Sequence, residues 1–71
     1  MHERVNAPEG FEGVMFYDDG IREYRVSFRA VGATWWTNCY HTAGHTYLTP
    51  AERNERAESA IVHALTVRGL I

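Results

Sequence analysis

Along residues 11–41, apolar and polar side chains alternate with the two-residue period of β-strands. Residues 11–17 predict a first strand, residues 21–31 a second, and residues 34–41 a third that is rich in β-branched and aromatic residues. Asp18-Asp19-Gly20 separates the first two strands. This segment is typical of a hairpin turn, because Asp-Gly tolerates the positive φ that tight turns require. The sequence therefore predicts an antiparallel hairpin followed by a third strand.

The second predicted strand has two unlike faces, because successive side chains point to opposite sides of a strand. Its apolar side consists of Tyr24, Val26, Phe28 and Ala30. Its polar side carries two arginines, Arg25 and Arg29. We expect the apolar side to be buried and the arginine side to remain available to a partner.

Residues 49–68 carry the signals of one amphipathic helix. Thr49-Pro50-Ala51-Glu52 forms a capping box, with proline at the first helical position. Apolar residues then recur at helical spacing: Ala57, Ala60, Ile61, Ala64 and Leu65. Gly69 follows the last turn, where glycine commonly ends a helix.

Together these elements predict a small α+β domain, in which an antiparallel sheet of three strands packs on one C-terminal helix in the order β-β-β-α. Residues 45–48 are expected to form either a fourth, edge strand or a loop. Residues 1–10 show no periodicity and contain Pro8 and Gly10, so they predict a flexible tail before a single domain of residues 11–71. The expected buried residues are Val14, Phe16, Tyr24, Val26, Phe28, Trp36, Ile61 and Leu65.

Composition narrows the compartment and the class of partner. A chain of 71 residues suits one domain, and its net charge of −2 provides no general attraction for nucleic acid or an anionic membrane. Cys39 is the only cysteine, which excludes an intrachain disulfide and favours a reducing compartment. No apolar run resembles a signal peptide or approaches a membrane span. We therefore expect a cytoplasmic protein with no membrane partner.

The predicted open face of the sheet carries the candidate binding residues: Arg25, Arg29, Tyr17, Met15 and Trp35, with His41 near its end. Aromatic residues beside arginines are typical of protein interfaces, since both contribute large contacts and directed polar groups. The same residues would suit single-stranded nucleic acid, with bases stacked on the rings and phosphates on the arginines. A third interpretation is that Trp35 packs against the tail or a loop. The acidic net charge ranks nucleic acid below protein.

Metal binding and catalysis have weaker signals. Cys39, His41 and His45 could ligate zinc if a turn at Gly44 brought His45 back, with His63 or His2 as a fourth ligand. The paired motifs typical of zinc sites are missing, so we expect neither a metal nor a cofactor. No catalytic motif is present, because a turn accounts for Asp18-Asp19 and the spacing of Cys39 and His41 sets no nucleophile–base geometry. We expect a protein that is not an enzyme.

One resemblance rests on residue motifs. Asp18-Asp19-Gly20, then Tyr24-Arg25-Val26-Ser27-Phe28, then Thr49-Pro50-Ala51-Glu52 and an alanine-rich helix resemble the HicB-type antitoxin domain over residues 14–65. The resemblance implies the same order of strands followed by a helix. It also implies neutralisation of a small ribonuclease toxin.

A second resemblance is architectural. Small size, one sheet with one helix and no catalytic motif are similar to small bacteriophage proteins that bind host enzymes, including inhibitors of bacterial RNA polymerase. This resemblance implies a regulator that inhibits or modulates a bacterial enzyme complex in the host cytoplasm, with RNA polymerase as the first candidate. The antitoxin and nucleic-acid interpretations remain as alternatives.

Overall fold

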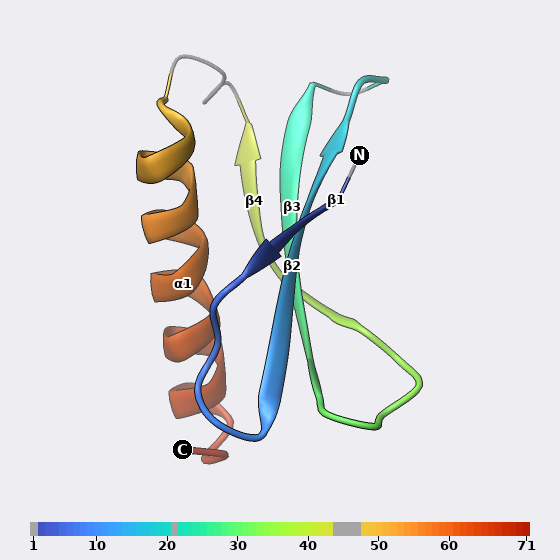
Figure 1. Cartoon of the computed structure of the whole chain (residues 1–71), viewed down its shortest axis with the longest axis vertical. Coiled ribbons are helices and arrows are strands. Elements are labelled where there is room, and N and C mark those ends of the chain that lie inside the picture. Colours follow the sequence, from blue (N-terminus) through green and yellow to red (C-terminus); the bar gives the residue numbers. More distant parts are fainter. Residues whose placement is uncertain (1, 21, 44–47) are drawn as a thin grey trace.

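The structure is a computed structural model that describes residues 2–20, 22–43 and 48–71. Its strands are β1 (His2–Val5), β2 (Phe11–Asp18), β3 (Glu23–Ala30) and β4 (Thr37–Ala43), and its helix is α1 (Pro50–Val67). The strands form one antiparallel sheet in the order β1-β2-β3-β4, and α1 lies against one face of it (Figure 1). The predicted α+β class, with an antiparallel sheet and a C-terminal helix, is confirmed.

The ends of α1 follow the predicted local signals. The backbone N–H of Glu52 donates to the Thr49 hydroxyl at 3.2 Å, and the Thr49 N–H donates to the Glu52 carboxylate at 3.1 Å. The hydrogen bond from the Thr49 backbone holds the pKa of the Glu52 carboxyl below its usual range. At the other end, Gly69 has a positive φ of 71°, and the Leu70 N–H donates to the Leu65 carbonyl at 2.9 Å.

The expectation of a flexible tail is wrong for His2–Val5, which pairs with β2 from His2↔Phe16 to Val5↔Gly13. Two contacts anchor this segment although its sequence is mostly polar. Val5 is buried in the core, and the Asn6 side-chain amide donates to the Glu58 carboxylate of α1 at 3.1 Å. Main-chain pairing, the burial of Val5 and the Asn6–Glu58 hydrogen bond therefore hold β1 in place, and none of them produces a visible periodicity in the sequence.

The face of β2 that packs on α1 is opposite to the predicted one. Met15 is only 2% exposed and Gly13 is buried, whereas Val14 and Phe16 lie on the other face. The cause is the register, which pairs Met15 with Val26. Residues directly opposite each other share a face, so the burial of Val26 brings Met15 inside.

The strand predicted at residues 34–41 is β4, which begins later, at Thr37. Trp36 therefore lies before the strand and is 41% exposed, so its predicted burial is wrong. Residues 31–36 form a connection in which Gly32 has a positive φ of 88°. The strand or loop predicted at residues 45–48 falls mostly outside the described residues, although Leu48 is described and buried.

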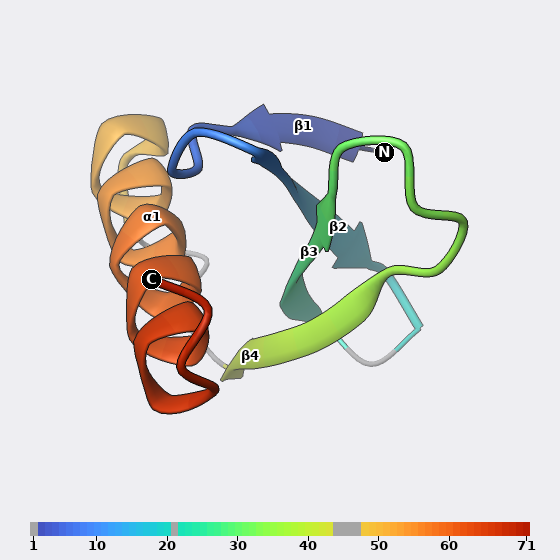
Figure 2. The same ribbon diagram turned by 90° about the horizontal axis from the view of Figure 1, so that it is seen from below.

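The core lies between α1 and the inner face of the sheet. Figure 2 shows the strands curving around it, with α1 closing the open side. Its buried residues are Val5, Met15, Val26, Phe28, Ala57, Ile61, Ala64 and Leu65. Within the described ranges, no helix combines the length and apolar character that a membrane crossing needs.

Gly13 is expected to tolerate no side chain, because an added Cβ would overlap Ile61 Cδ1 and lie 3.0 Å from the Val5 carbonyl oxygen. We expect Gly13→Ala to lower the free energy of unfolding by about 1–3 kcal/mol. Urea denaturation measures this change.

Ile61→Val is the matched control, because it removes the overlapping Cδ1 atom. Alone it should cost about 0.5–1.5 kcal/mol. In combination with Gly13→Ala, the total loss should be smaller than the sum of the two single losses. Additive losses would show that the contact with Ile61 is not the cause.

Candidate functional site

Among the described residues, no element covers the face of the sheet that points away from α1 (Figure 1). We call this surface the open face. The strand registers place four rows of side chains across it: Asp18 and Glu23; His2, Phe16, Arg25 and His41; Arg4, Val14, Ser27 and Asn38; and Glu12 and Arg29. The open face therefore combines aromatic, aliphatic and charged groups.

The basic groups of β3 and β4 on the open face lie beside carboxylates. Arg29 forms an ion pair with Glu12 through Nε and Oε1. Arg25 lies 3.7 Å from the Asp18 carboxylate. His41 Nδ1 lies 3.3 Å from the Glu23 carboxylate. The charges on this face are thus balanced locally and form no basic patch.

The connection of residues 31–36, which we call the tryptophan loop, extends the open face away from α1 (Figures 1 and 2). Trp35 is 84% exposed and Val31 is 67% exposed. The Arg29 guanidinium lies over the Trp36 ring, with its carbon 4.2 Å from the ring centroid. Arg29 therefore links the loop to Glu12 on β2.

The structure keeps only part of the predicted binding set together. Arg25 and Arg29 lie on the open face, and Trp35 lies in the adjoining tryptophan loop. Met15 and Tyr17 do not belong to this surface. Met15 is buried beneath α1, and Tyr17 stands on the helix side of the sheet, with its ring centroid 4.7 Å from that of Tyr24.

Sequence reasoning missed several residues of the open face. Phe16 and Val14 were expected in the core, and Phe16 instead packs its ring 4.9 Å from the ring of His2. Glu12 was not considered, although its place opposite Arg29 follows directly from the register. The missing signal was the register itself, because the wrong face of β2 was assigned to the core.

Cys39 and His41, two of the candidate zinc ligands, lie on opposite faces of the sheet. Asn38 pairs with Ser27 and Tyr40 with Val26, so a bulge leaves Cys39 without an opposite residue. Cys39 consequently turns to the helix side, while His41 stays on the open face. In the described part of the chain, no three His, Cys, Asp or Glu side chains lie close enough together to hold a metal ion. His45 lies outside that part.

Cys39 is a half-buried structural thiol. Its Sγ donates to the Val26 carbonyl oxygen at 3.5 Å, and burial raises the pKa of the thiol above its usual value. A raised pKa reduces the fraction of thiolate, which is the nucleophilic form. This environment is the opposite of the one that activates a catalytic cysteine.

Comparison with known proteins finds no protein-family model, no curated protein and no solved structure that matches this chain.

Cys39 should be alkylated slowly by iodoacetamide at pH 8 in the folded protein. Because burial raises its pKa, the rate should keep rising at pH values where a free thiol is already ionised. Unfolding in urea should restore the rate of an unhindered cysteine. Equal rates for the folded and unfolded chains would contradict this account.

Removing the Arg29 side chain should expose Trp36. In a Trp35→Phe background, Trp36 is the only tryptophan, so its quenching by acrylamide can be followed alone. Arg29→Gln should increase this quenching, because the guanidinium that covers one ring face is lost. Arg25→Gln is the control and should leave the quenching unchanged, since the contact recorded for Arg25 is with Asp18.

Proposed function

We propose that this protein is a non-enzymatic module that binds another protein through the open face and the tryptophan loop. The observation that carries the proposal is the exposure of Trp35 beside Trp36 and Arg29. Tryptophan and arginine are the residues most enriched at interface hot spots, where a few side chains supply most of the binding energy. A tryptophan that is 84% exposed has most of its ring available to pack on a partner.

Preorganisation supports the same function. The Arg29 guanidinium is held between the Glu12 carboxylate and the Trp36 ring. The tryptophan loop is anchored by hydrogen bonds from the Val31 N–H to the Gly10 carbonyl at 2.9 Å and from the Ala33 N–H to the Ala30 carbonyl at 3.0 Å. Groups that are already ordered lose less entropy on association, so more of the contact energy is available for binding.

Electrostatics favours a protein over single-stranded nucleic acid. Affinity for phosphates comes from cations that release counterions, and here Arg25 and Arg29 each lie beside a carboxylate. The net charge of −2 adds to this disadvantage. A protein surface with its own mixture of charged and apolar groups suits a balanced face better.

As the target we propose a bacterial enzyme complex, with RNA polymerase as the first candidate. The choice of target rests on the architectural resemblance to small bacteriophage inhibitors. The choice of surface rests on Trp35, Trp36 and Arg29.

Trp35→Ala should weaken binding to purified bacterial RNA polymerase by about 30-fold or more, the equivalent of a hot spot of about 2 kcal/mol. The free energy of unfolding should hardly change, because the side chain is 84% exposed. Biolayer interferometry measures the affinity. The control is Val67→Ala, which removes an apolar side chain that is 69% exposed on α1 and should leave the affinity unchanged.

Affinity capture from a bacterial lysate tests the proposed binding surface and the proposed target independently. If Trp35→Ala and wild-type chains capture the same proteins to the same extent, the proposed surface is wrong. If RNA polymerase does not bind while another captured protein depends on Trp35, the proposed target is wrong and the binding function stands.

A further inference from the structure

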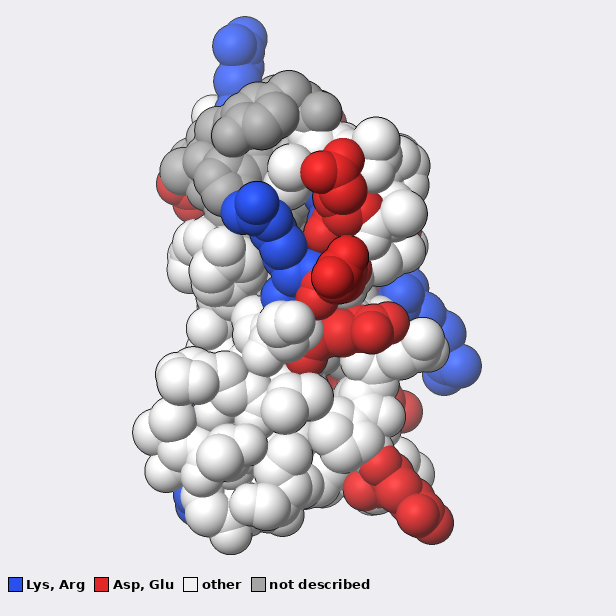
Figure 3. Space-filling model, turned by 90° about the vertical axis from the view of Figure 1, so that its left-hand side faces the viewer, with Lys and Arg blue, Asp and Glu red and all other residues white. Residues whose placement is uncertain are grey.

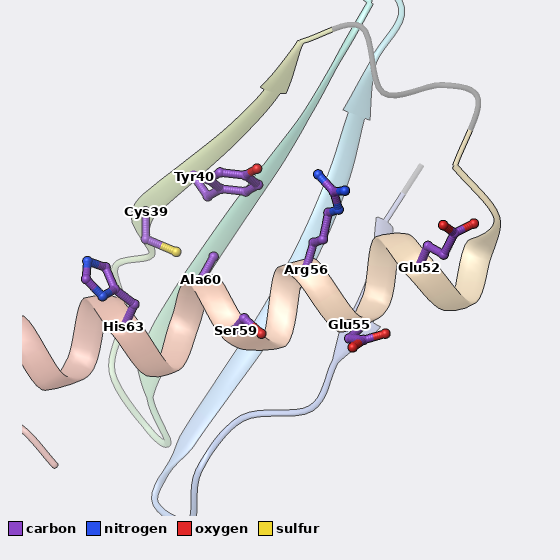
Figure 4. Close-up of a pocket in the computed structure, with 8 residues that line it drawn as sticks. All are labelled: Cys39, Tyr40, Glu52, Glu55, Arg56, Ser59, Ala60 and His63. Atoms are coloured by element: carbon purple, nitrogen blue, oxygen red, sulfur yellow. The ribbon is translucent and has the colours of Figure 1, made fainter.

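A second surface lies between β4 and α1, away from the open face. Figure 4 shows Cys39 and Tyr40 of β4 facing a groove whose opposite wall is α1, where Arg56, Ala60 and His63 stand. Its volume is about 580 Å³. Ligand sites in proteins commonly occupy about 300–1,000 Å³, so the groove is large enough for a short peptide segment.

The strand wall of this groove is an edge of the sheet. β4 is the last strand in the order β1-β2-β3-β4, and no further strand pairs with it among the residues that the structure describes. Edge strands are usually protected by proline, lysine or other charged side chains. The seven residues of β4, TNCYHTA, contain none of these. Two features limit its pairing locally, namely the bulge at Cys39 and the hydrogen bond from the Tyr40 N–H to the Asn38 side-chain oxygen at 3.3 Å.

The helix wall leaves room beside that edge. Ala60 lies between Arg56 and His63 on the helix wall, and its short side chain leaves space between α1 and β4 (Figure 4). An extended segment lying along β4 would pair with its main chain and direct alternate side chains into the groove. The shape of the site therefore matches a peptide backbone in the β conformation.

The charged side chains in the groove indicate which side chain such a segment would place there. The Arg56 side chain stands in the groove near Tyr40, and no ion pair is recorded for it among the described residues (Figure 4). Glu52 and Glu55 also line the groove, towards the N-terminal end of α1, where acidic side chains gather on the surface (Figure 3). The Glu52 carboxylate is held by the Thr49 N–H in the capping box, and Glu55 points away from β4 (Figure 4), so Arg56 is the charged group that stands nearest the strand wall. One carboxylate would pair with Arg56, while additional negative charge would be repelled.

We propose that this groove binds an extended segment of a partner protein, which adds to β4 as a fifth strand and places a single carboxylate side chain against Arg56. This site is distinct from the open face.

Three fluorescein-labelled peptides test whether the groove prefers a carboxylate side chain beside Arg56. Each matches the seven-residue length of β4, alternates threonine and valine, and has glutamate, glutamine or lysine at its centre. Fluorescence anisotropy with the full chain should show about three- to tenfold tighter binding of the glutamate peptide than of the glutamine peptide, as expected for a partly exposed ion pair. The lysine peptide should bind most weakly.

Arg56→Gln should remove the preference for glutamate without unfolding the chain, because Arg56 is exposed on α1. Arg22→Gln removes another exposed arginine, in the β2–β3 turn, and should leave the preference intact. A glutamate preference that survives Arg56→Gln would overturn the proposal, as would no binding of any peptide at about 1 mM.

N-methylated peptides test the strand pairing. One peptide is methylated on the alternate amides that would face β4, and this peptide should not bind. The other is methylated on the amides that would face away from β4, and it should still bind. Equal affinity of both methylated peptides for the protein would overturn strand addition. A second copy of the chain could occupy the β4 edge instead, and sedimentation equilibrium would detect this dimer. A stable dimer that excludes the glutamate peptide would overturn the proposal and assign the edge to that second copy.

Discussion

The pairing of β2 with β3 determines which side chains reach α1 and which remain on the open face. With Met15 opposite Val26 and Gly13 opposite Phe28, the inner face of the hairpin offers a shallow surface on which Ile61 can pack closely against Gly13. The same register places Glu12 opposite Arg29 on the outer face. Core packing and the arrangement of the candidate binding surface are therefore two results of one alignment, because a shift by one residue would exchange the faces.

The elements that depend on local chemistry could be predicted from the sequence. The capping box at Thr49 and the glycine at position 69 define α1 without help from the rest of the chain. The face of β2 depended on the length of the turn. The expected three-residue turn, Asp18-Asp19-Gly20, would place even-numbered residues of one strand opposite even-numbered residues of the other. In the structure, the last pair before the turn is Asp18 with Glu23, so four residues, 19–22, connect the strands. An even number of connecting residues aligns odd-numbered residues of β2 with even-numbered residues of β3, which explains the burial of Met15 in place of Val14 and Phe16.

Other features depend on contacts between distant residues, which no local pattern reveals. β1 exists because Val5 enters the core and Asn6 reaches Glu58. The bulge at Cys39 separates Cys39 from His41, although their spacing would place them on one face of a regular strand. For the candidate site, the alternation along β3 was enough to place Arg25 and Arg29 on the open face. Trp35 was expected on a strand of that face, whereas it lies in the tryptophan loop before β4. The stack of Glu12, Arg29 and Trp36 required the register and the position of the loop.

The two edges of the sheet are unequal. β1 has only four residues and carries the charged pair Glu3 and Arg4, whereas β4 has seven residues without a formal charge apart from the histidine at position 41. Short strands with charged side chains are poor templates for further pairing. If two copies paired through β4, the joined sheet would have a β1 strand at each end, and β1 is a poor template. Within the described residues, the unequal edges therefore favour a closed pair over an open-ended fibre.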